Sequence, residues 1–188
     1  MIGGWKMKHA ALFLAQGFEQ IEALGTLNVL RRAGVPVVTV AVGTPDLYVT
    51  STHKVTVKAD CMIDDVKASD LMLAVFPGGM PGAANLAGNE AVLQIARDVY
   101  AAGGITAAIC AAPMVLSAAG ILDGHKYTCY PGCEARIGGD YTGSFVEIDG
   151  QIVTACGPGA SLDFAFAILE KMDMADTAAT IAKNMQLR

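Results

Sequence analysis

The chain has 188 residues, of which 53% are hydrophobic and 21 are glycine, and a formal net charge of −5. This length and composition predict a single domain over residues 7–188, after a short tail at residues 1–6. The negative charge argues against nucleic-acid binding and against binding to an anionic membrane, and no apolar run approaches the roughly 20 residues that span a bilayer. The five scattered cysteines predict no disulfide framework. Without a convincing secretory signal, we expect a cytoplasmic protein.

Strands and helices are expected to alternate along the first half of the chain. Apolar runs predict strands at residues 8–15, 36–42 and 71–76, and helical periodicity predicts helices at residues 19–33 and 89–102. Between these elements, residues 47–57 alternate in polarity and predict a small hairpin. Residues 60–69 are predicted to form a polar connector that can include a short helical turn.

The second half continues this alternation. Its expected elements are a strand at residues 105–109, a helix at 113–119, an extended piece at 127–130, a hairpin of strands 145–148 and 151–155, and helices at 161–172 and 175–185. Asp149-Gly150 is a strong hairpin signal, and Ser161 is the expected N-cap of its helix. The pattern predicts a flavodoxin-like three-layer α/β/α sandwich, with a mostly parallel sheet and helices on both faces.

Cys110 stands where a buried strand ends and a helix begins near Pro113. A thiol at a helix N-terminus faces unpaired N–H groups and the positive end of the helix dipole, which favour the thiolate. A free cysteine is usually an inert small hydrophobe, so the abrupt change from strand to helix is what makes Cys110 a candidate nucleophile. The strand ends at Gln16-Gly17 and Pro77-Gly78-Gly79 are expected at the same edge of the sheet.

Other motifs are less specific. The chain lacks a dinucleotide fingerprint and a phosphate-binding loop with lysine, so no cofactor is expected. Cys129 and Cys133 have no second Cys or His pair at zinc spacing, and His125 would not share a face with both, so no metal site is expected. Glu22 opens the first helix, where its charge complements the dipole. Alternatively, Glu22 reaches the thiol from a neighbouring strand end.

Four motifs in the same order resemble the ThiJ/PfpI superfamily, specifically its DJ-one branch, and their pattern is closest to bacterial members. The motifs are Gly17-Phe18-Glu19-Gln20-Ile21-Glu22, Phe76-Pro77-Gly78-Gly79, Ala107-Ala108-Ile109-Cys110-Ala111-Ala112-Pro113, and Gly157-Pro158-Gly159 with Ser161-Leu162-Asp163-Phe164-Ala165. The resemblance extends from about Lys8 to Met185, which is nearly the whole chain.

The resemblance implies that Cys110 is the nucleophile, with Glu22 as the carboxyl group beside it. The backbone N–H groups of Gly79 and Ala111 match the oxyanion pocket of the family. A protonated Glu22 can donate a hydrogen bond to the thiolate, whereas an ionised Glu22 raises the thiol pKa by repulsion, so we expect Glu22 to be buried with a raised pKa. The further residues expected to line the site are Gly78, Tyr130, Pro158, Cys156 and His53.

The chain departs from the family pattern at three places. Tyr130 stands where a deglycase member has histidine, so Glu22 or Tyr130 would have to handle protons. Ala111 stands where the protease-like branch has histidine, which argues against peptidase activity. His53 and Cys156 stand where the Parkinson-associated member has arginines. Their presence argues against a positively charged entrance to the site that would attract anionic substrates.

The resemblance implies two different classes of function. The first is a cysteine-dependent glyoxalase or deglycase-like enzyme, acting on methylglyoxal, glyoxal or their early adducts on proteins or nucleotides. The second is a redox-responsive stress protein or chaperone in which Cys110 is oxidised. Older descriptions of the family add a role in thiamine-precursor metabolism, but no residue here indicates a thiazole phosphate site. The family is typically homodimeric, and we expect the first helix and the neighbouring hairpin to form the contact surface.

Overall fold

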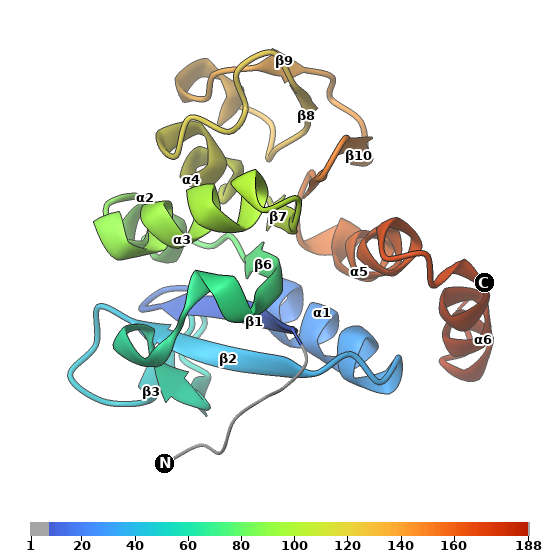
Figure 1. Cartoon of the computed structure of the whole chain (residues 1–188), viewed down its shortest axis with the longest axis horizontal. Helices are drawn as coiled ribbons and strands as arrows, with labels where there is room; N and C mark the ends of the chain where they lie inside the picture. Colours follow the sequence, from blue (N-terminus) through green and yellow to red (C-terminus); the bar gives the residue numbers. More distant parts are fainter. Residues whose placement is uncertain (1–7, 188) are drawn as a thin grey trace.

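A computed structural model describes residues 8–187, so the tail expected at residues 1–6 lies outside the described part of the chain. The molecule is built around a seven-stranded sheet in the order β10-β11-β7-β6-β1-β2-β5 (Figure 1). Neighbouring strands pair in parallel except β10, which runs antiparallel to β11 at one edge. The flavodoxin-like fold and the mostly parallel sheet expected from the sequence are confirmed.

The strands at the centre of the sheet are buried along their length. All five residues of β7 and the last six of β1 are buried, as expected of strands that helices cover on both faces. The strands of the main sheet are β1 (His9–Ala15), β2 (Val37–Val42), β5 (Cys61–Met62), β6 (Leu71–Phe76), β7 (Ile105–Ile109), β10 (Val146–Asp149) and β11 (Ile152–Ala155). Two small sheets pair β3 (Tyr48–Thr50) with β4 (Thr56–Lys58), and β8 (Lys126–Tyr127) with β9 (Asp140–Tyr141).

The helices form two groups, one on each face of the sheet (Figure 1). They are α1 (Gln20–Arg32), α2 (Gly82–Ala87), α3 (Glu90–Ala101), α4 (Pro113–Ala118), α5 (Ser161–Lys171) and α6 (Ala175–Asn184). Helices α1 and α5 contact each other, as do α2, α3 and α4. None of the helices in the described part of the chain has the length and apolar character needed to span a membrane.

The position of the candidate site follows from the strand order. From β1, the chain first adds β2 on one side and later adds β6, β7 and β11 on the other. Because parallel crossovers are right-handed, α1 and α3 are placed on opposite faces of the sheet. The carboxyl ends of β1 and β6 therefore lie where the chain changes direction across the sheet, the place at which sheets of this kind bind their ligands.

Three expectations about local structure were wrong. A strand, β5, lies in the stretch read as a connector, and α2 occupies residues 82–87, where no helix was expected. Both elements are too short to give a periodic pattern, and α2 begins with glycine directly after proline. Ser161 is the first helical residue of α5 rather than its N-cap, and its hydroxyl donates to the carbonyl of Pro158 at 2.7 Å.

Candidate functional site

Cys110 occupies the sharp turn between β7 and α4. Its φ is +64°, an uncommon conformation for a residue with a side chain. The Cys110 amide donates to the carbonyl of Ala155 at 2.8 Å, and its carbonyl accepts from the Tyr130 amide at 2.8 Å. These hydrogen bonds hold the turn in a conformation that it would not adopt alone. The turn presents a thiol on a residue that is only 9% exposed.

Two backbone N–H groups, those of Gly79 and Ala111, lie close to the Cys110 sulfur and lower the pKa of its thiol. Gly79 has a φ of +85°, and a Cβ at this position would lie 2.5 Å from the Glu19 nitrogen and 2.6 Å from the Gly17 oxygen. Only glycine therefore allows the turn after β6 to pass this close to the turn after β1. The oxyanion pocket formed by Gly79 and Ala111 stays a prediction, with which the closeness of these two amides to the thiol is consistent.

The carboxyl group beside the thiol belongs to Glu22, which is completely buried in the first turn of α1. Its Oε2 accepts a hydrogen bond from the Gly78 amide at 2.7 Å. Its Oε1 has no hydrogen-bond partner among the described residues, and the neighbouring Cys110 thiol lowers the pKa of the carboxyl group. A Cβ on Gly78 would lie 2.7 Å from the Cys110 Cβ and 2.8 Å from Glu22 Oε2, so glycine is also needed here.

Glu19 fixes the first turn of α1 against the site. As the N-cap residue, it accepts a hydrogen bond from the Glu22 amide through Oε2 at 2.8 Å. Its own amide donates to the Gly78 carbonyl at 2.9 Å. Glu19 belongs to the first of the four motifs, but its role as the helix cap was not predicted from the sequence. Glutamate is not among the residues preferred at an N-cap, so the sequence carries no clear signal for this cap.

Cys110 and Glu22 determine each other's protonation. Burial raises the pKa of Glu22 to about 7, although the hydrogen bonds from Gly78 and Cys110 act in the opposite direction. Burial and the charge of Glu22 raise the pKa of the Cys110 thiol, whereas the Gly79 and Ala111 amides lower it. When Glu22 is protonated, the repulsion disappears and its O–H becomes a third donor to the thiolate. The expected burial of Glu22 and its raised pKa are both present.

The loops that carry Tyr130, Cys156 and Pro158 adjoin the Cys110 turn, which is hydrogen-bonded to the backbone of Tyr130 and of Ala155. The ring of Tyr130 is 51% exposed and lies over Gly157, where a Cβ would be 3.2 Å from the ring Cδ2. Pro158 begins the short 3₁₀ turn that follows. Cys156 is half-buried, and its amide donates to the Phe145 carbonyl at 3.1 Å. The three positions expected to line the site therefore lie in the loops that follow β8 and β11.

His53 lies beside the start of α1 and contacts neighbours of Glu22 rather than the thiol. Its Nδ1 is 3.1 Å from Gln20 Nε2 and 4.0 Å from Glu19 Oε1. Its side chain is 69% exposed. The structure therefore places His53 at the rim of the site, without a polar contact to Cys110 among the interactions of residues 8–187.

His125 does not approach Cys129 and Cys133. Its ring nitrogens lie 2.9 Å from the Tyr100 hydroxyl and 3.3 Å from Asp149 Oδ2, at the opposite end of the sheet strands. Within residues 8–187, no group of three or more His, Cys, Asp or Glu side chains has the arrangement of a metal site.

Comparison with known proteins identifies the family. The model of the DJ-1/PfpI family matches residues 8–171. The chain is 35% identical over 186 residues to the Parkinson disease protein 7 homolog of Danio rerio, covering 96% of this chain and 98% of the relative. It is 28% identical over 172 residues to the glutathione-independent glyoxalase DJR-1.2 of Caenorhabditis elegans, covering 90% of each. The crystal structure of Drosophila melanogaster DJ-1beta superposes with a TM-score of 0.91 at 31% identity, covering 97% of this chain and 99% of that one. The chain therefore belongs to the DJ-1/PfpI family.

Proposed function

We propose that the protein is a cysteine-dependent glyoxalase or deglycase-like enzyme that acts on methylglyoxal, glyoxal or their early adducts on proteins or nucleotides. The observation that carries this proposal is the Cys110 thiol, which has a buried carboxyl group on one side and two amide donors on the other. The name of the Caenorhabditis elegans relative, a glutathione-independent glyoxalase, supports the same activity. Catalysis by a protein thiol would make glutathione unnecessary.

The proposed reaction converts methylglyoxal and water to lactate. The Cys110 thiolate attacks the aldehyde carbon, a C–S bond forms, and the new alkoxide takes a proton from Glu22. The Glu22 carboxylate then removes the hydrogen of that carbon as a proton and gives it to the neighbouring carbonyl carbon, while the proton of the new hydroxyl group moves to the neighbouring oxygen. The product is a thioester of lactate on Cys110. Water hydrolyses the thioester, which releases lactate and restores the thiolate.

Glu22 is the proton carrier in this scheme because it is the titratable group hydrogen-bonded to the thiol. Its pKa of about 7 suits a group that must give and take protons near neutral pH. Tyr130, which replaces the family histidine, is half exposed at the opening. We therefore assign Tyr130 to the wall of the site and proton transfer to Glu22.

The test is release of lactate from methylglyoxal in glutathione-free buffer. Replacing the nucleophile in Cys110→Ser should reduce kcat/KM at least about hundredfold. Cys133→Ser is the matched control, because this half-buried cysteine lies in a surface turn and should keep the wild-type rate. Equal rates for Cys110→Ser and the wild type would refute the proposed activity.

The same geometry supports a second candidate, a redox-responsive stress protein or chaperone. The Gly79 and Ala111 amides and a protonated Glu22 place three hydrogen-bond donors around the sulfur. These donors would stabilise a sulfinate at Cys110. Mass spectrometry after mild peroxide treatment distinguishes this role, because it requires selective addition of two oxygens to Cys110. Oxidation spread evenly over the five cysteines would argue against it.

We also propose that residues 7–188 act as one domain and that two copies associate through α1 and the β3–β4 hairpin. A cytoplasmic location stays a prediction from the sequence. Association through these elements would place the Cys110 site next to the subunit interface, because Glu22 belongs to α1 and the hairpin contacts the turn that precedes it.

A further inference from the structure

A groove lies between the edge strand β10 and helix α5, outside the Cys110 site. It has a volume of about 490 Å³, which is within the range of ligand-binding sites. Phe145, Val146 and Ile148 line it on the strand side, and Phe166 lines it on the helix side. Phe145 and Ile148 are 54% and 42% exposed. The groove is therefore an apolar surface that remains open to solvent.

The outer edge of β10 has no partner strand within residues 8–187. On the inner edge, the Cys156 amide donates to the Phe145 carbonyl, so these two residues form a hydrogen-bonded pair. Pairs alternate along an antiparallel ladder, and Val146 and Ile148 therefore belong to non-hydrogen-bonded pairs with β11. The N–H and C=O groups of Val146 and Ile148 point to the open edge, where a further strand can bind them.

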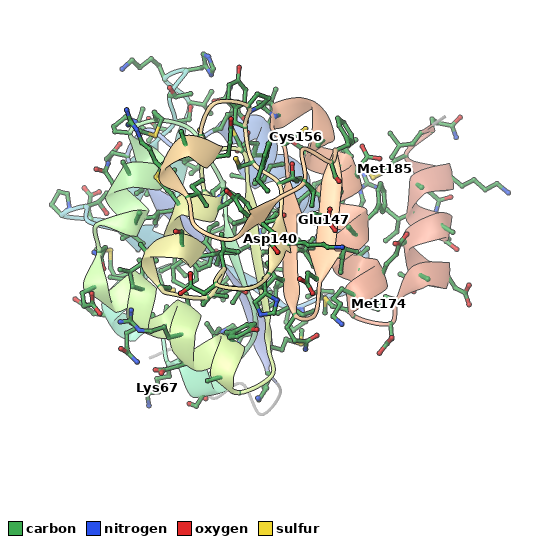
Figure 2. The ribbon with its side chains drawn as sticks, turned by 90° about the horizontal axis from the view of Figure 1, so that it is seen from above. Lys67, Asp140, Glu147, Cys156, Met174 and Met185 are labelled. Atoms are coloured by element: carbon green, nitrogen blue, oxygen red, sulfur yellow. The ribbon has the colours of Figure 1, made fainter. Side chains whose placement is uncertain are left out.

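The surroundings of this edge are acidic. Asp163 and Glu170 project from the exposed side of α5 and line the groove, and no Lys or Arg within residues 8–187 lines it. On the opposite face of β10 lie Glu147 and Asp149 (Figure 2 labels Glu147), and both His125 and Lys126 lie beside Asp149. A strand added at this edge would have apolar contacts on one of its faces and carboxylates near each of its two faces.

We propose that this groove binds an extended segment of a partner protein in which apolar residues alternate with Lys or Arg. The segment adds to β10 as an eighth strand, bonded to the backbone of Val146 and Ile148. Its apolar side chains enter the groove against Phe166, and its cationic side chains face Glu147. A second copy of this chain is a poor occupant, because an isologous contact would bring these carboxylates together on a chain whose net charge is −5.

The test is fluorescence anisotropy of the full chain with labelled eight-residue peptides. The probes are an alternating valine–lysine peptide, an alternating valine–glutamate peptide and oligolysine. We expect saturable binding of the valine–lysine peptide that weakens with added salt, and at least about tenfold weaker binding of the other two. Equal binding of the valine–glutamate peptide would overturn the proposal. Equal binding of oligolysine would also overturn it, because charge alone would then account for the interaction.

Two variants locate the binding site. Ile148→Pro removes an outward-facing N–H without breaking the ladder to β11, so it should weaken binding at least about tenfold, whereas Ile148→Val should bind normally. The double variant Glu147→Lys, Glu170→Lys should weaken binding similarly. Its control is Glu90→Lys, Asp98→Lys, with the same charge change on α3. Each variant is first checked for a cooperative thermal transition. If both groove variants remain folded and bind normally, or if they abolish self-association of the chain, the proposal is wrong.

Discussion

Glu22 is a carboxyl group held out of water, and this position sets how stability depends on pH. Its pKa rises from the usual value of a free carboxyl group, about 4.3, to about 7 in the folded protein, mainly through burial. Between these two values, the folded state binds more protons than the unfolded state. The free energy of unfolding therefore decreases as pH rises through this window. The destabilisation that comes from ionising the buried Glu22 is complete above pH 7.

Glu22→Gln should remove this dependence. Glutamine can accept from the Gly78 amide through its oxygen and donate to Cys110 through its nitrogen, so the fold is retained. From pH 5 to 8, the wild type should lose about 2 to 3 kcal/mol relative to the variant, as measured by urea unfolding. Glu170→Gln, an exposed carboxyl on α5, should follow the wild type. Parallel pH profiles for the wild type and Glu22→Gln would contradict the raised pKa.

The residues of the site differ in how far the sequence could predict them. Cys110 and Glu22 belong to continuous motifs, and the physics of a thiol beside a carboxyl group predicted the burial of Glu22. The environment of Tyr130 was not predictable, because its contact with Gly157 joins two loops that are distant in sequence. The same holds for His53, which reaches α1 only through the hairpin that carries it.

At the scale of elements, the site depends on two turns that touch through backbone atoms. The turn after β6 lies against the turn after β1, and the Glu19 amide donates to the Gly78 carbonyl at 2.9 Å. In the same region, the Gly82 amide donates to the Gly17 carbonyl at 3.3 Å. This contact positions the Gly79 amide, which lies in the turn after β6, relative to the Cys110 thiol in the turn after β7. A side chain inserted between the turns would therefore disturb both stability and the site.

Gly79→Ala tests this contact. The substitution combines a φ of +85° with a Cβ placed 2.5 Å from a backbone nitrogen, so a shift of the turn is unavoidable. We expect a loss of about 3 kcal/mol or more in unfolding free energy, together with loss of lactate release. Gly159→Ala is the control, since a Cβ there would meet no atom within 4 Å. A Gly79→Ala variant as stable as Gly159→Ala would contradict the close approach of the turns.

The predictability of an element depended on its length. The long apolar strands and the helices α1 and α3 could be predicted because each repeats its pattern over several residues. The strand β5 has two residues and is defined by its pairing with β2, which no local pattern shows. Helix α2 has six residues and follows proline. Such short elements are determined by the packing of the whole chain rather than by their own sequence.

At the scale of the whole molecule, two surfaces carry several of the exposed apolar residues, and they adjoin at α5, where Ile21 lines a hollow together with Asp163 and Phe166 of the β10 groove. One is the groove beside β10. The other is the α1–hairpin surface, defined by Ile21, Tyr48 and Val55, which are 55%, 53% and 44% exposed. Backbone hydrogen bonds fasten the hairpin to the turn before α1, from Gly17 to Thr50 at 2.8 Å and from Thr52 to Phe18 at 2.9 Å. The α1–hairpin surface is thus firmly supported, as an interface between copies requires.

We predict that the wild type sediments as a dimer, at twice the chain mass of 19.4 kDa, and that Ile21→Glu sediments as a monomer. In an isologous interface each partner carries the same substitution, so one mutation buries two carboxylates and the dissociation constant should rise at least about hundredfold. Ile148→Glu introduces the same charge at a similarly exposed residue of the β10 groove. It should leave the dimer intact, because that groove is proposed to bind a different partner. A dimer lost in Ile148→Glu but kept in Ile21→Glu would mean that the two surfaces have been assigned the wrong way round.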